Sequence, residues 1–183
     1  MLGRGTVRMH DRGHILHMTC FLCFTETSCN LFCLKWKNIV KLSQLIIKPK
    51  YMKGFNDNIE KAALNNNNFR QVLYTGKHSQ LVLMSLKPQE EIGMEVHVEN
   101  DQFFRFEKGE GKVIIDDNEY DVSDGSAIIV PSGARHNVVN VSATDDLKLY
   151  TIYSPAHHKD GIVRATKAEA ESNEAEFDGV TTE

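Results

Sequence analysis

Four side chains in the middle of the sequence have the types and spacing needed to hold a metal ion. Glu95 and His97 are two residues apart, so a strand would point both side chains to the same face, and Gln102 would begin the next strand. His136 follows a turn rich in Pro and Gly. Carboxylate, imidazole and amide oxygen are all competent ligands for divalent first-row metals. The sequence therefore predicts one divalent ion (Zn, Mn, Fe or Ni) at Glu95, His97, Gln102 and His136.

His136 belongs to a longer pattern, Gly125-x5-Pro131-x-Gly133-x2-His136-x3-Asn140. Gly125 permits a tight turn into a strand, and Pro131 with Gly133 forms the next turn. That second turn aims His136 inward from the start of the following strand. Asn140 lies four residues further on and hence on the same inward face. A lone histidine in a strand is more often a satisfied core residue than a ligand, but the complete pattern favours a ligand.

The pattern matches the second cupin motif at every defined position. The first cupin motif usually reads Gly-x5-His-x-His-x3-4-Glu-x6-Gly, and the sequence resembles it as Gln89-x5-Glu95-x-His97-x4-Gln102-x6-Gly109. Only His97 and Gly109 have the usual residue types. Gln89, Glu95 and Gln102 replace Gly, His and Glu, respectively.

Two alternatives to this ligand set remain open. A different register places Glu99 beside His97 and adds Asp101 as a ligand, but both would then face inward from a loop. Gln102 is preferred because it keeps the six-residue spacing to Gly109. In the other alternative, Glu95 and Gln102 hydrogen-bond inside the barrel without a metal, since buried polar groups need partners.

Short segments rich in Val, Ile, Leu and aromatic residues must position these side chains. About nine of them, separated by Gly, Pro, Asn and Asp, predict an all-β barrel or sandwich. They span residues 69–75, 80–86, 93–98, 102–107, 112–116, 119–122, 127–130, 136–141 and 147–153. A short helix within residues 54–65, capped by Asn56 or Asp57, is expected before them. The acidic, Ala-rich stretch 167–176 predicts a frayed helix or a disordered tail.

The resemblance to small single-domain cupins covers residues 69–154. It implies a jelly-roll barrel, the cupin double-stranded β-helix, with a short N-terminal helix and a polar C-terminal tail. The expected organisation is a lead-in at 52–68, the barrel at 69–154 and the tail at 155–183. Within the family, the sequence is similar to the mannose-6-phosphate-isomerase-like group.

Residues 1–51 differ from the rest of the chain. They hold eight Lys and Arg residues against two acidic ones, and all four cysteines: Cys20, Cys23, Cys29 and Cys33. Four thiolates at short spacing could form a small zinc site. However, the two pairs are only five residues apart and the segment shows no helical or strand period. The preferred interpretation is an extension that is not a functional domain, with Met52 as a natural beginning.

Composition narrows the classes of partner. The chain has 183 residues, of which 41% are hydrophobic and 25% charged, which suits one ordinary core. A net charge of −4 argues against nucleic-acid and anionic-membrane partners. The barrel lacks cysteine, so a reducing cytoplasm is expected. A homodimer is also expected, supported by outward apolar residues such as Phe103.

Three functions are consistent with such a site. The first is an isomerase-like enzyme acting on a small sugar or sugar phosphate, because phosphomannose isomerases bind zinc with Gln, Glu and two His. The second is an Fe(II) or Ni(II) dioxygenase, and the third is a non-enzymatic, metal-dependent binding module for small molecules. Isomerisation needs a base. The catalytic residues are unknown from the sequence, and Glu99, Asp101 and Tyr150 are candidates by exclusion.

Overall fold

The computed structural model describes residues 6–11, 14–19 and 52–183. Backbone contacts divide the chain into two units, Met1–Tyr51 and Met52–Glu183. In the first unit, β1 (Thr6–Asp11) and β2 (His14–Thr19) form an antiparallel hairpin, although the sequence shows no strand period there. The candidate zinc ligands Cys20, Cys23, Cys29 and Cys33 lie outside the described residues.

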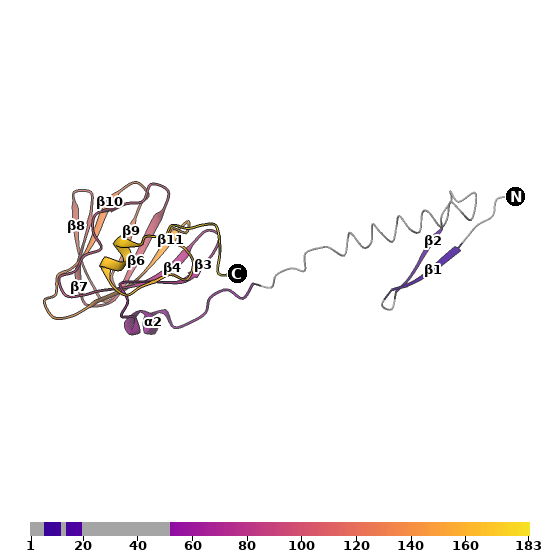
Figure 1. Ribbon diagram of the computed structural model, residues 1–183, viewed down its shortest axis with the longest axis horizontal. Coiled ribbons are helices and arrows are strands. Elements are labelled where there is room, and N and C mark those ends of the chain that lie inside the picture. The colour runs from indigo at the N-terminus through magenta and orange to yellow at the C-terminus, as the bar shows by residue number, and fades with distance from the viewer. Residues whose placement is uncertain (1–5, 12–13, 20–51) are drawn as a thin grey trace. The chain divides into compact units, whose positions relative to one another are not determined.

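The second unit is built from two antiparallel sheets (Figure 1). One sheet has the order β5-β10-β7-β8 and the other β12-β3-β4-β11-β6-β9. Neighbouring strands are mostly not consecutive in sequence, as a jelly roll requires. The all-β prediction is therefore confirmed. The strands are β3 (Arg70–Thr75), β4 (Gln80–Leu86), β5 (Glu95–Val96), β6 (Asp101–Lys108), β7 (Glu110–Ile115), β8 (Asn118–Ser123), β9 (Ala127–Val130), β10 (Arg135–Asn140), β11 (Leu147–Ser154) and β12 (Val163–Arg164).

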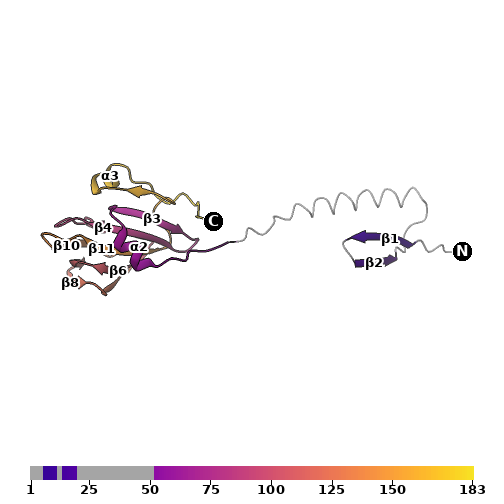
Figure 2. The same cartoon turned by 90° about the horizontal axis from the view of Figure 1, so that it is seen from below.

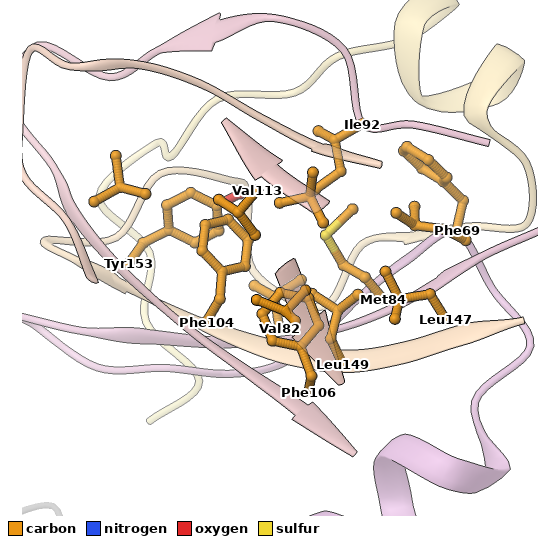
Figure 3. Packing of buried hydrophobic residues seen from close by; sticks show 14 of the residues in the cluster. Phe69, Val82, Met84, Ile92, Phe104, Phe106, Val113, Leu147, Leu149 and Tyr153 are labelled. Carbon is orange, nitrogen blue, oxygen red and sulfur yellow. The ribbon is translucent and has the colours of Figure 1, made fainter. Parts of the chain in front are cut away.

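Strand β6 shows how the sequence directs side chains into the barrel. Gln102, Phe104 and Phe106 are buried, whereas Phe103 and Arg105 between them are only partly covered. Successive side chains of a strand point to opposite faces, so burial alternates along a strand with one buried face. Large buried side chains of β4, β6, β7 and β11 point toward one another in the core (Figure 3). The same inward face that holds Phe104 and Phe106 thus delivers Gln102 to the barrel interior.

Helix α2 (Ile59–Asn65) contacts β4, β6 and β11. Its N-cap is Asn58, whose side chain accepts a hydrogen bond from the Lys61 amide, and not Asn56 or Asp57 as expected. The buried ammonium group of Lys148 lies at the end of this helix. Its Nζ donates to the Asn66 carbonyl at 2.7 Å and to Ser85 Oγ at 2.8 Å. Among the described residues, no helix is long and apolar enough to cross a membrane.

The C-terminal segment packs against the barrel. Strand β12 adds to β3, and helix α3 (Lys167–Ser172), capped by Thr166, places Ala170 in the core. Figure 2 shows α3 beside β3, on a different side from α2. The last residues are also tied down, because the Thr182 amide donates to the Thr75 carbonyl at 3.0 Å. The sequence favours a frayed helix or disorder here because the segment is polar, but backbone pairing and one small apolar contact hold it in place.

The turn before β5 explains how the chain departs from the first cupin motif. Gln89 has φ 61°, in the left-handed region that favours glycine, and it stands where the motif usually has Gly. Its amide donates to the Ser142 carbonyl at 3.1 Å, so the backbone conformation is held by a neighbouring loop. Gln89 therefore adopts the backbone conformation that glycine would adopt at this position of the motif.

We expect Gln89→Gly to raise the free energy of unfolding by up to about 1 kcal/mol, because the strain removed exceeds the extra entropy of glycine in the unfolded chain. Urea unfolding measures the change. Gly125→Ala is the matched control, since Gly125 has φ 86° and an added Cβ would meet no atom within 4 Å. It should lose stability by about the same amount. A loss of stability in Gln89→Gly would contradict the prediction.

Candidate metal centre

The candidate centre lies where the two sheets meet. Glu95 on β5 pairs directly with His136 on β10, and His97 follows immediately after β5. Gln102 comes from β6, in the other sheet. The loop after β9 closes this end, because the Gly133 amide donates to the His97 carbonyl at 2.9 Å. Backbone pairing therefore fixes the Cα positions of all four predicted residues.

The structure brings the four predicted side chains together. Glu95, His97 and His136 each offer a ligand atom, and these atoms lie within 4.8 Å of one another. His136 Nε2 lies 2.9 Å from Gln102 Oε1, and His97 Nε2 lies 3.2 Å from Glu95 Oε2. His97, Gln102 and His136 are buried, whereas the Glu95 side chain is 24% exposed.

Hydrogen bonds orient two of these side chains so that acceptor atoms face each other. Gln102 Nε2 donates to Thr151 Oγ1 at 3.1 Å, which turns its Oε1 toward His136. His136 Nδ1 lies 3.2 Å from the Ala134 carbonyl, and it can donate there only when it carries the ring proton. Nε2 then presents a lone pair toward Gln102 Oε1. A cation bound between these two acceptor atoms would remove their mutual repulsion.

The charges around Glu95 keep it ionised. Burial raises the pKa of Glu95, but the hydrogen bond and charge of His97, followed by the charge of Arg70, outweigh it and leave the pKa below its ordinary value. Arg70 is buried, with Nη2 3.7 Å from Glu95 Oε1. This contact occupies one carboxylate oxygen and leaves Oε2 toward His97. Burial also lowers the pKa of His136, which keeps the imidazole neutral.

The alternative candidates lie elsewhere. Glu99 is exposed, and Asp101 Oδ1 accepts a hydrogen bond from the Ser132 amide at 2.9 Å, which ties down the neighbouring loop. Tyr150 lies beside Phe103, with their ring centroids 6.2 Å apart, on a partly exposed position of β11. Asn140 is buried but donates to the carbonyls of Leu86, Lys87 and Asp145. Its place in the motif is therefore structural.

Sequence reasoning missed two groups beside the centre. Arg70 begins β3, and nothing in its local pattern distinguishes it from a surface arginine. His157 lies with its ring centroid 4.3 Å from that of His97, and Tyr153 packs against both rings. The adjacent pair His157-His158 just after Pro155 was the available signal. These residues come next to Glu95 and His97 only when the chain folds.

The fold and this arrangement of residues agree with the comparison to known families. The sequence profile described as a cupin domain matches residues 82–153. The crystal structure of BH2720 from Bacillus halodurans is 39% identical, with a TM-score of 0.65, and the match covers 69% of this chain and 100% of that one. The chain belongs to the cupin family, whose members commonly bind a divalent metal.

Two curated relatives are similar over most of their lengths. YrkC of Bacillus subtilis, described as an uncharacterized protein, is 46% identical over 132 residues, which is 69% of this chain and 70% of the relative. An uncharacterized protein of Acanthamoeba polyphaga mimivirus is 45% identical over 109 residues, 58% of this chain and 68% of the relative.

Proposed function

We propose that the protein binds one divalent metal ion through Glu95, His97, Gln102 and His136, and that it uses the ion to bind and isomerise a small sugar or sugar phosphate. The observation that carries the proposal is the convergence of two imidazoles, a carboxylate and an amide oxygen turned toward His136 at one end of the barrel. Such a mixed set suits Zn, Mn, Fe or Ni.

The spacing of the donor atoms supports a single ion. Two bonds of about 2.1 Å that meet near a right angle hold their outer atoms about 3 Å apart. The pair His136 Nε2 and Gln102 Oε1, at 2.9 Å, and the pair His97 Nε2 and Glu95 Oε2, at 3.2 Å, both have this separation. Four protein ligands leave one or two positions for water or substrate.

Each surrounding residue has a definable task in this proposal. When bound, the ion acts as a Lewis acid toward a carbonyl or hydroxyl oxygen. Thr151 holds the Gln102 amide so that its oxygen faces the centre. Ala134 fixes the His136 ring, and Arg70 holds one oxygen of Glu95 away from His97. These outer contacts keep ligand side chains in a single orientation, which is what metal centres require.

A metal-dependent binding module is the second candidate, and the placement of the proposed bases favours it. Glu99, Asp101 and Tyr150 are directed to solvent, to a loop amide and to the sheet surface, so none of them supports proton transfer at the centre. A protein without a base would bind a hydroxy-carbonyl ligand without converting it. Homodimerisation and a cytoplasmic location stay predictions.

Turnover and binding assays with one ligand panel separate the candidates. The full chain, loaded with Zn, Mn, Fe or Ni in turn, is incubated with free and phosphorylated aldoses and ketoses, and products are followed by NMR. If the protein is the proposed isomerase, a sugar of the panel is converted, and the conversion is lost in His136→Ala. Saturable binding without conversion would favour the module. Oxygen uptake with the Fe- or Ni-loaded protein would instead indicate a dioxygenase.

A further inference from the structure

A second group of metal-ligating side chains lies beyond His157. His157, His158 and Glu174 each offer a ligand atom, and these atoms lie within 4.8 Å of one another. None of the three belongs to either cupin motif. The two histidines follow β11, whereas Glu174 follows α3, so the group joins the barrel to the C-terminal segment.

His158 makes this group more than a chance cluster. Its side chain is 1% exposed, and neither ring nitrogen has a hydrogen-bond partner among residues 52–183. A buried imidazole normally has a hydrogen-bond partner for at least one nitrogen, because burying an unpaired polar group is unfavourable. In a neutral imidazole one of the two ring nitrogens offers a lone pair. A metal ion would supply the missing partner.

The backbone beneath the group is firmly held. Gln80 is buried, and its side chain donates to the His158 carbonyl at 2.6 Å and accepts from the His158 amide at 2.8 Å. The strand-like pairing of His158 with Glu176 places the Glu174 segment alongside. The Phe177 amide completes this pairing by donating to the His157 carbonyl at 2.9 Å. The polar contacts of this region therefore fix the main chain and leave both ring nitrogens of His158 without a hydrogen bond within residues 52–183.

Charge determines how strongly such a group can bind a cation. Arg70 Nη1 lies 3.7 Å from Glu174 Oε1, while Nη2 faces Glu95, so Arg70 lies between the two groups. The Glu174 side chain is 54% exposed, and one of its oxygens already lies within 4.8 Å of the ligand nitrogens of His157 and His158. The positive charge of Arg70 opposes a cation in both groups, and this group offers three protein ligands where the centre at His136 offers four, so it should bind more weakly.

We infer that His157, His158 and Glu174 form a second site for a first-row divalent cation of the kind that prefers imidazole, such as Zn²⁺. Two imidazoles and one carboxylate match the three-ligand sets of open zinc sites, in which water completes the coordination. The site uses none of the ligands of the proposed centre. The two ions would therefore bind to neighbouring but separate groups.

Zinc stoichiometry tests this inference. The full chain is stripped with a chelator, saturated with Zn²⁺ and desalted, and bound zinc per chain is measured by elemental analysis. Glu174→Ala, which removes the ligand oxygen, is expected to bind one zinc fewer than the wild type, and His158→Leu should match it. Glu171→Ala is the control, because Glu171 is a more exposed carboxylate (66%) on the neighbouring helix α3. It should bind as much zinc as the wild type.

Combination with the first centre distinguishes the two proposals. His97→Ala/His136→Ala should also lose one zinc, and adding Glu174→Ala should lose a second. Unchanged zinc in Glu174→Ala would overturn the second site and leave the first intact. If the triple variant loses no more zinc than the double variant, the two groups share one ion and the inference is wrong.

Discussion

His97→Ala/His136→Ala should bind one divalent ion fewer per chain than the wild type, by elemental analysis after desalting. The two imidazoles are the buried nitrogen donors of the proposed centre, at 8% and 2% exposure, and water cannot replace them at fixed positions. An ion present at about a thousand times its Kd stabilises a protein by about 4 kcal/mol. The rise in Tm on adding zinc should thus shrink by about 10 °C in the double variant.

The control for this experiment is His78→Ala, because His78 is exposed in the loop between β3 and β4. It removes an imidazole without touching the centre, and its zinc content and its zinc-dependent Tm should equal those of the wild type. Comparing each variant with and without zinc removes the effect of the substitution on the apo fold. Unchanged metal content in the double variant would falsify the assignment of His97 and His136.

Phe104→Ala should lower the free energy of unfolding by about 3–5 kcal/mol, the usual cost of removing a fully buried aromatic ring. Phe104 is 0% exposed and lies in the core with Tyr153 and Val113 (Figure 3). Its ring centroid is 6.2 Å from that of His136, so the cavity would form directly beneath the centre. Urea unfolding in the presence of a chelator isolates this effect from metal binding.

Ile129→Ala is the matched control for the core. Ile129 lies on β9, the neighbour of β6, and is 68% exposed, so its loss should change the free energy of unfolding by no more than about 0.5 kcal/mol. A loss below about 1.5 kcal/mol in Phe104→Ala would mean that the barrel interior collapses around the cavity. The expected cost of removing the Phe104 ring would then be wrong.

The strands were predictable because their signals are local. Two expected strands, 80–86 and 127–130, have the structural bounds of β4 and β9, and the others differ by a few residues at their ends. Alternating burial and turn residues are properties of short stretches, which a single sequence contains in full. Gln89 shows the limit of motif matching, because its glycine-like conformation is held by a hydrogen bond that its amide donates to another loop.

The sequence by itself determined the family, the all-β class and four candidate ligands, since each rests on residue types at fixed spacing. Only the tertiary structure decided which of these side chains meet. Gln102 joins His136 because two sheets close on each other, and Arg70 and His157 approach from strands and loops far away in the chain. Such contacts depend on packing in three dimensions, and no local pattern encodes them. For the same reason the sequence did not predict that Glu174 lies near His157 and His158. The C-terminal segment that carries Glu174 has the composition of a tail, but it pairs with the chain at His158.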